Sequence, residues 1–220
     1  MNGYLLIDKP KGWTSFDVVN KVRHIVQNSQ LNNSDKKRFP VGHTGTLDPL
    51  ATGLLVLLLG KYTKRAPELT KLDKTYQVTV KLGETSSTGD GEGVKTIINS
   101  RRPRLNDIKN TLKLFTGEID QVPPVFSAIK IDGQRAYKLA RAGKKVEIEP
   151  RKVTIYTVGL KSYDYPYLDF TTEVSSGTYV RSLVEDIGKV LETGAYMCDL
   201  KRTKIGSFDI KSAIDLKNIS

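Results

Sequence analysis

The sequence predicts an α+β fold with a central mixed or antiparallel sheet flanked by helices. Most apolar segments are short, and they either alternate with polar residues or run unbroken between glycines, which is typical of strands. Only a few segments place apolar residues three and four positions apart, as an amphipathic helix does. Many strands interrupted by a few helices favour the α+β class.

Three strands and one helix are predicted in the first half of the chain. The strands are short apolar or alternating runs at residues 4–7, 54–59 and 76–82. The run between Gly53 and Gly60 has no polar face, so we expect that strand to be fully buried. Ser15 can cap a helix whose apolar face extends to Val26. Polar, turn-rich stretches predict loops at residues 28–38 and 83–93.

The second half continues the mixture of strands and helices. The predicted strands are residues 125–131, 153–160 and 168–175, with a short one near Phe208. The predicted helices are residues 108–115, 134–142 and 180–191, with a last helical turn near Ala213. No repeat or linker separates these segments, so no domain boundary is expected.

Composition points to a basic, soluble protein and excludes several classes. The 220 residues include 35 basic and 24 acidic side chains, a net charge of +11. A single cysteine rules out internal disulfides, and with only two histidines we expect no metal site. The apolar runs are too short to cross a bilayer and the N-terminus does not resemble a signal peptide, so we expect a cytoplasmic protein without membrane contact. The charge favours a polyanionic partner, and a basic protein without one is the alternative.

The densest unusual segment is HTGTLDPLATGL, residues 43–54. Its glycines, proline and threonines fix a loop around one carboxylate, Asp48, directly before the buried strand. Such a carboxylate can act as a nucleophile or a base, whereas the structural alternative is a turn cap, because Asp-Pro commonly opens turns. His43 can be an acid, a base or a stacking group, or equally a hydrogen-bonded loop histidine. No nucleophile-elbow motif supports a Ser-His-Asp triad.

Two further segments carry unusual charge. Residues 89–93, GDGEG, lack the features of a phosphate cradle or a calcium loop, so a flexible turn is the better interpretation. Asp90 and Glu92 nevertheless leave a metal-dependent nuclease as a rival hypothesis. Residues 130–152 hold eight basic and three acidic side chains. On a helix, Arg135, Lys138 and Arg141 would form a basic stripe, either for phosphates or simply for solvent.

Arg181 lies at the start of the most amphipathic predicted helix. One interpretation points it into a cleft, where it pairs with a catalytic carboxylate. The other is a surface pair with Glu185, four residues on, which contributes only about 0.3–0.5 kcal/mol. Cys198 is interpreted as a small buried residue.

Six blocks, in order over nearly the whole chain, resemble the TruB-type tRNA pseudouridine synthases. They are GYLLIDKP (3–10), HTGTLDPLATGL (43–54), KTY with LGET (74–76 and 82–85), PPVFSAIK (123–130), SGTYVR (176–181) and LKRT (200–203). One block would be weak, but six in order are specific. The resemblance implies a pseudouridine-synthase fold that isomerises uridine 55 in the T-loop of tRNA. The base is flipped out, the C1′–N1 bond is cleaved and C1′ is rejoined to C5.

The resemblance also implies roles for individual residues. Asp48 is the essential catalytic carboxylate, Arg181 pairs with it and favours its anion, and Tyr76 assists proton transfer at C5. The implied substrate-binding residues are His43, Tyr76, Tyr179 and Leu200. His43 fills the space left by the flipped base, Tyr76 stacks on that base, and the other two line its pocket. The isomerisation has no net redox change, so we expect no cofactor and no metal.

The chain departs from the family pattern in several places. Phe126 stands where a tyrosine is usual, Lys201 replaces a common arginine, and residues 86–90 differ from the usual loop. A chain of this length has no room for the C-terminal PUA-like module of many relatives, so we expect residues 1–220 to form a single catalytic domain. The expected partner is the T-loop and T-stem of tRNA, bound by a monomer. A non-catalytic RNA-binding or tRNA-folding protein is the rival from another class.

Overall fold

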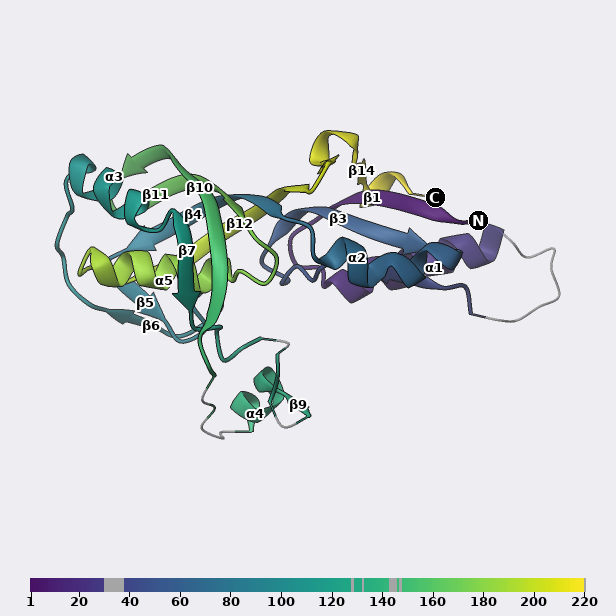
Figure 1. The fold of residues 1–220 in the computed structure, drawn as a ribbon, viewed down its shortest axis with the longest axis horizontal. Coiled ribbons are helices and arrows are strands. Elements are labelled where there is room, and N and C mark those ends of the chain that lie inside the picture. Colours follow the sequence, from purple (N-terminus) through teal and green to yellow (C-terminus); the bar gives the residue numbers. More distant parts are fainter. Residues whose placement is uncertain (30–37, 128, 132, 143–145, 147, 220) are drawn as a thin grey trace. The chain divides into compact units, whose positions relative to one another are not determined.

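The chain forms two compact units in a computed structural model that describes residues 1–29, 38–127, 129–131, 133–142, 146 and 148–219 (Figure 1). The first unit comprises Met1–Tyr76 and Leu200–Ser220, and the second comprises Gln77–Asp199. Strands β4 (Lys74–Leu82) and β12 (Ala195–Ile205) each contribute residues to both units. Helices and mixed sheets confirm the predicted α+β class.

The first unit is built on a mixed sheet with the strand order β14–β1–β3–β12. Strand β1 (Gly3–Lys9) is antiparallel to β3 (Thr52–Leu59) and parallel to β14 (Ile214–Asp215). Strand β3 pairs in parallel with β12 through Lys201 and Arg202. Strands β2 (Val41–His43) and β13 (Phe208–Asp209) add antiparallel pairs to β3 and β12. Short 3-10 helices η2 (Ile210–Ser212) and η3 (Leu216–Asn218) accompany β14.

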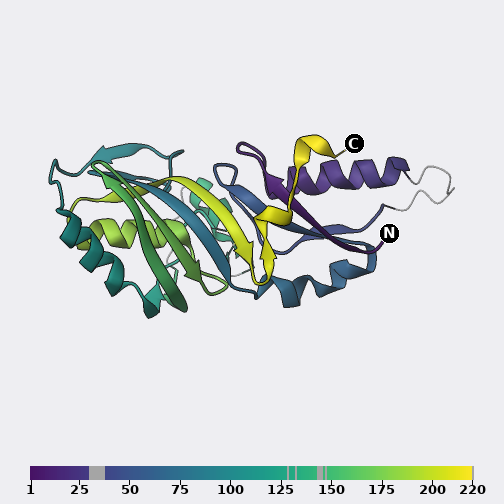
Figure 2. The same cartoon turned by 90° about the horizontal axis from the view of Figure 1, so that it is seen from above.

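Both faces of β3 are covered, which explains its unbroken apolar sequence. Helix α1 (Ser15–Ser29) packs its valines against one face of β1 and β3, and Leu55, Leu57 and Leu59 lie in that cluster. The opposite face presents Leu54 and Val56 to a second cluster, drawn largely from the C-terminal segment. Helices η1 (Gly60–Arg65) and α2 (Ala66–Thr70) follow β3 directly, and Figure 2 shows them beside the strands of this unit.

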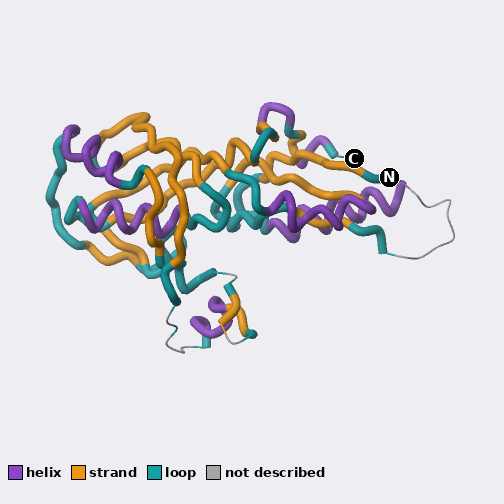
Figure 3. Tube along the Cα trace, in the orientation of Figure 1, coloured by secondary structure: helices purple, strands orange, loops and turns teal. Residues whose placement is uncertain are grey.

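The second unit has the strand order β4–β11–β10–β7. Strand β10 (Arg151–Asp164) is antiparallel to both β11 (Tyr167–Val174) and β7 (Gly117–Gln121). Two hairpins stand apart from this sheet. They pair β5 (Glu84–Ser86) with β6 (Lys95–Ile97), and β8 (Lys130–Ile131) with β9 (Gln134–Arg135). The helices are α3 (Leu105–Leu114), α4 (Ala136–Arg141) and α5 (Val180–Val190). Figure 3 shows strands and helices in both units.

Most predicted elements are confirmed, and the errors have identifiable causes. The predicted strand at 125–131 is wrong except for its last two residues, because Pro123 and Pro124 open an irregular segment there. The predicted loop at 83–93 contains β5, and the helix at 134–142 begins only at Ala136. Helix α1 continues to Ser29, and the rest of the predicted loop at 28–38 lies mostly outside the described residues.

The cap of α1 is also a correction. Thr14 rather than Ser15 caps the helix, because the Thr14 hydroxyl accepts a hydrogen bond from the Asp17 amide at 3.1 Å. The Asp17 carboxylate in turn accepts from the Thr14 amide at 2.9 Å, which completes a capping box. The Ser15 hydroxyl is therefore available for a different contact. In the described part of the chain, no helix is long and apolar enough to span a membrane.

Candidate functional site

Asp48 lies on the loop that joins β2 to β3 in the first unit, and hydrogen bonds hold the residues on either side of it. The Ser15 hydroxyl accepts from the Leu47 amide at 2.8 Å and donates to the Leu47 carbonyl at 3.1 Å. The Gly12 amide donates to the Pro49 carbonyl at 2.8 Å. Within the loop, the Ala51 amide donates to the Asp48 carbonyl at 3.1 Å. The N-terminal end of α1 and the turn before it therefore fix the backbone around the carboxylate.

Two buried cations belong to the same neighbourhood. The fully buried side chain of Lys9 donates to the carbonyls of Pro10 at 3.0 Å and Trp13 at 2.6 Å. Burial lowers the pKa of Lys9 to about 8, and the nearby Asp48 carboxylate opposes this shift. Arg202, only 1% exposed, donates to the carbonyls of Leu54 at 2.8 Å and Gly45 at 3.0 Å. Arg202 therefore ties both ends of the Asp48 loop to β12.

His43 ends β2 just before this loop. The Gly45 amide donates to His43 Nδ1 at 3.3 Å, so that nitrogen carries no proton. Burial, with a smaller contribution from Arg202, lowers the pKa of His43 below its usual range. The ring is consequently neutral at pH 7 with its proton on Nε2. An uncharged planar ring is suited to stacking. The hydrogen bond to Nδ1 also fits the alternative interpretation of His43 as a hydrogen-bonded loop histidine.

Tyr76 and Leu200 are the other predicted site residues of the first unit. Tyr76 lies on β4 and Leu200 on β12, and each side chain is 8% exposed. Lys74 shares the face of β4 with Tyr76 because strand residues two apart point the same way. Its ammonium donates to the carbonyls of Thr70 at 2.7 Å and Leu72 at 2.5 Å. Burial, aided by Arg202, lowers the pKa of Lys74 to about 8.

Arg181 and Tyr179 lie in the second unit, at the start of α5. Arg181 is 7% exposed, so its interpretation as a surface partner of Glu185 is wrong. Its guanidinium donates to the carbonyls of Thr88 at 3.1 Å and Phe126 at 2.9 Å, and pairs with Asp90 at 3.4 Å. Three groups from two separate loops therefore orient this side chain.

Asp90 has a structural role that the sequence did not reveal. Its carboxylate is buried and also accepts hydrogen bonds from the Thr88 hydroxyl at 2.5 Å and the Glu92 amide at 3.0 Å. Gly91 and Glu92 form a turn, as predicted, but Asp90 is held in place by these bonds, so the expectation that residues 89–93 are flexible is wrong. The Asp90 carboxylate is bound by three donors and anchors Arg181. Because Asp90 has this structural role, the acidic pair Asp90 and Glu92 no longer favours a nuclease. Among the described residues, no group of three potential metal-ligating side chains occurs.

Tyr179 is held through its backbone. The Gln121 side chain accepts from the Tyr179 amide at 2.8 Å and donates to the Tyr179 carbonyl at 3.1 Å. Gln121 is 1% exposed and ends β7, so a sheet strand sets the position at which α5 begins. Neither this glutamine nor Asp90 belongs to a sequence pattern that would have identified it.

The structure groups the predicted residues by unit. His43, Asp48, Tyr76 and Leu200 belong to the first unit, and Tyr179 and Arg181 to the second. The pairing of Arg181 with Asp48 stays a prediction. Of the predicted basic segment at 130–152, Arg135 and Lys138 are exposed, whereas Lys144 and Lys145 lie outside the described residues. Lys9, Ser15 and Arg202 are additional residues that position the Asp48 loop.

The buried lysine on β4 gives a prediction for stability against pH. Because the pKa of Lys74 falls from 10.5 to about 8 on folding, the unfolded chain binds more protons between these values, and stability rises with pH. Lys74→Met removes this contribution. Urea unfolding at pH 7.5 and 9.5 should therefore show the wild type gaining about 2 kcal/mol more than the variant over this interval. The exposed Lys71→Met is the control and should follow the wild type. Equal pH dependence in all three proteins would contradict the prediction.

Comparisons with known proteins agree with the sequence blocks. Residues 33–180 match the model of the TruB family pseudouridylate synthase N-terminal domain, and residues 181–220 match that of the tRNA pseudouridylate synthase B C-terminal domain. A protein of Flavobacterium johnsoniae named tRNA pseudouridine synthase B is 46% identical over 96% of this chain and 92% of its own length. One of the same name from Aquifex aeolicus is 45% identical over 99% of this chain and 73% of its own.

Solved structures give the same result for the fold. The chain resembles one in a Cbf5-Nop10-Gar1 complex, with a TM-score of 0.73 and 29% identity over 98% of this chain. It also resembles one in an H/ACA RNP bound to a substrate RNA containing 2′-deoxyuridine, with a TM-score of 0.69 and 27% identity over 98% of this chain. The chain spans about half the length of each of these two, 53% and 51%. The pseudouridine-synthase fold expected from the sequence is confirmed.

Proposed function

Because this chain belongs to the TruB family of pseudouridylate synthases, we propose that it converts uridine 55 in the T-loop of tRNA to pseudouridine. Relatives that share 42–46% of its residues are named tRNA pseudouridine synthase B, which supports tRNA as the substrate. The net charge of +11 suits a polyanionic partner. We propose further that the protein acts as a cytoplasmic monomer, without a cofactor, and that residues 1–220 form its catalytic domain.

The observation that carries the proposal is the fixed carboxylate. Asp48 stands on a loop held by Ser15 and Arg202, and the buried ammonium of Lys9 lies close enough to interact with it electrostatically. Whether Asp48 attacks a carbon or removes a sugar proton, it must be ionised and correctly placed. A turn cap would require neither the buried cations nor the hydrogen bonds from α1.

The proposed reaction breaks the C1′–N1 bond of the target nucleotide and forms a C1′–C5 bond after the base has turned. The proton at C5 is lost and one is gained at N1, so atoms and electrons balance without a co-reactant. Asp48 permits the cleavage, and Arg181, whose guanidinium is held by Asp90, pairs with Asp48. Tyr76 stacks on the turning base and assists the proton transfer at C5.

Base flipping supplies roles for the remaining residues. Removing a uridine from a folded loop costs a few kcal/mol, and stacking of an aromatic ring offsets about 1–3 kcal/mol. The neutral ring of His43 is proposed to fill the vacated position. Tyr179, fixed by Gln121, and Leu200 are proposed to form walls of the uridine pocket.

The experiment is position mapping on an unmodified tRNA transcript with substoichiometric protein. Carbodiimide labelling and primer extension should detect one pseudouridine per tRNA, at position 55. Each protein molecule should modify more than one tRNA molecule. A transcript with cytidine at that position is the control and should stay unmodified. Binding without product would favour the non-catalytic RNA-binding hypothesis. Loss of product, or of RNA-strand cleavage, on addition of EDTA would favour a metal-dependent nuclease. Product at other positions would contradict the proposed specificity.

A further inference from the structure

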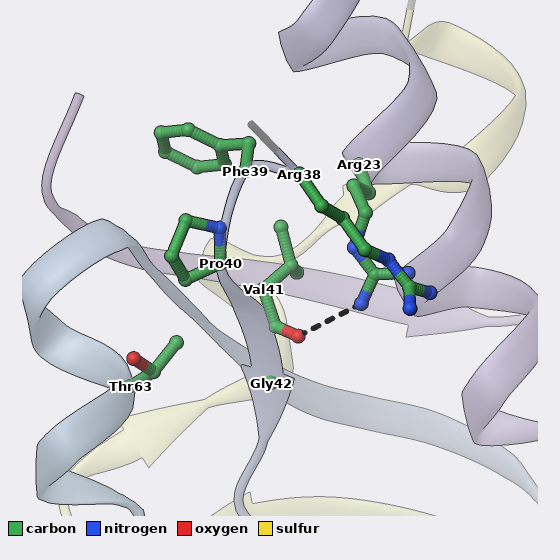
Figure 4. A pocket seen from close by; sticks show the side chains of 7 residues that line it. All are labelled: Arg23, Arg38, Phe39, Pro40, Val41, Gly42 and Thr63. Atoms are coloured by element: carbon green, nitrogen blue, oxygen red, sulfur yellow. Dashed lines mark hydrogen bonds between the residues drawn. The ribbon is translucent and has the colours of Figure 1, made fainter. Parts of the chain in front are cut away.

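A pocket in the first unit carries two arginines outside the candidate site. It has a volume of about 330 Å³ and lies between α1, the segment leading into β2, and η1. Its lining residues are Arg23, Arg38, Phe39, Pro40, Val41, Gly42 and Thr63. Figure 4 shows the side chains of Arg23 and Arg38 side by side at one wall, with Phe39 and Pro40 at another. None of these residues has a role in the proposed reaction.

The hydrogen bonds of Arg23 leave a buried donor, its Nε–H, without an acceptor among the described residues. Its terminal nitrogens donate to Asn20 Oδ1 at 2.7 Å and to the Val41 carbonyl at 3.1 Å, which fixes the guanidinium over β2. Leaving a buried donor without a partner is unfavourable, so this Nε–H calls for an acceptor, which a bound anion can supply.

The two guanidinium groups also repel each other. Burial and the charge of Arg38 both lower the pKa of Arg23. In the described part of the chain, no carboxylate pairs with either arginine. Two adjacent cations that have no carboxylate partner among the described residues attract an anion, and arginine's planar set of donors matches the oxygens of phosphate.

We propose that this pocket binds a phosphate group, and that its occupant in the working enzyme is a backbone phosphodiester of the RNA substrate. The second half of the proposal rests on the proposed function, because RNA is the substrate only if that function holds. Arg38, which is exposed, meets the phosphate first, and Arg23 completes the contact from the fixed floor of the pocket. The site reads no base, so it contributes affinity and orientation rather than sequence preference.

The first experiment tests the phosphate chemistry without RNA. Inorganic phosphate is added to ¹⁵N-labelled protein, and the side-chain Nε–H signals of the arginines are followed, with sodium chloride at matched ionic strength as the control. The Arg23 signal should shift and saturate with phosphate, and Arg38→Gln should weaken this binding at least several-fold. Arg38 is exposed, so its replacement leaves the fold intact. A shift that is identical in chloride, or unchanged in Arg38→Gln, would overturn the proposal.

The second experiment tests the RNA assignment. The affinity for tRNA is measured from 50 to 300 mM KCl for the wild type, Arg38→Gln and the control Arg104→Gln, which removes the same charge from an exposed position on the second unit. One lost phosphate contact should reduce the slope of log Kd against log [KCl] by about 1 in Arg38→Gln only. Equal slopes in Arg38→Gln and the wild type would overturn the RNA assignment, even if free phosphate binds.

The two proposals fail in different ways. If the wild type makes pseudouridine but Arg38→Gln has the wild-type salt dependence, the pocket proposal is wrong and the proposed function stands. If the wild type makes no pseudouridine, the proposed function is wrong, and the phosphate titration still decides whether the pocket binds this anion.

Discussion

Asp48→Asn should abolish pseudouridine formation, by about 10⁴-fold or more in single-turnover rate, while tRNA binding stays within a few-fold of the wild type. The amide keeps the shape of the carboxylate, so the loop and its hydrogen bonds to Ser15 and Gly12 persist, because they involve the backbone on either side. What is lost is the negative charge, which both candidate mechanisms require. Filter binding and mapping of position 55 in the same preparations give the two quantities.

Asp8→Asn is the matched control. Asp8 belongs to the same unit, and among the described residues its carboxylate makes only a long contact with Lys201 at 3.9 Å, with both side chains about 40% exposed. The same change of charge there should leave the rate within a few-fold of the wild type. If Asp48→Asn formed pseudouridine at a near-normal rate, the Asp48 carboxylate would not be required for the reaction. An equal loss in both variants would instead indicate a general effect of charge on RNA binding.

Gly53→Ala should destabilise the protein by more than about 3 kcal/mol and lower its melting temperature by roughly 10 °C. Gly53 has a φ of +99° and pairs with Arg202 across β3 and β12. A Cβ atom there would lie 2.3 Å from the Arg202 carbonyl oxygen and 2.8 Å from its nitrogen. Since both contacts are with backbone, the two strands must separate, and Arg202 then withdraws from the Asp48 loop.

Gly42→Ala provides the comparison in the same sheet. A Cβ atom at this position would meet only the Thr63 methyl group at 3.8 Å, an ordinary packing distance. Thermal unfolding should therefore show a change of no more than about 1 kcal/mol. A Gly53→Ala protein as stable as Gly42→Ala would show that the strands tolerate the side chain and that the close approach is not needed.

Asp48 could be identified as a candidate from the sequence, because the residues that mark its loop are its neighbours in the chain. Glycines and a proline around Asp48 indicate a fixed loop, and the apolar run of β3 indicates a buried strand after it. The burial of the basic residues that hold this loop could not be predicted in the same way. Lysine and arginine are usually exposed, so nothing in the composition of LKRT predicts that Arg202 is 1% exposed and bonded to two carbonyls.

The same reason explains why β12, the longest of the strands that were not predicted, was missed. Strand β12 carries Asp199, Lys201 and Lys204, a charge pattern that favours a loop, and its pairing with β3 depends on residues almost 150 positions away in the chain. The ion pair of Arg181 with Asp90 could not be predicted from the sequence either. Helical spacing offers Glu185, whereas Asp90 comes from a loop that only the folded second unit brings to α5.

The division of the first unit between two distant stretches of chain affects how the protein can fold as it is synthesised. Strand β1 takes β14 as a neighbour and β3 takes β12, yet these partners lie after residue 199. On the ribosome, residues 1–76 emerge first and must wait, with one edge of β1 and the beginning of β3 unpaired, until Leu200–Ser220 has left the exit tunnel. The second unit, residues 77–199, is continuous and can complete its own sheet in the meantime. The Asp48 loop, which needs Arg202, is therefore among the last parts of the protein to take its final shape.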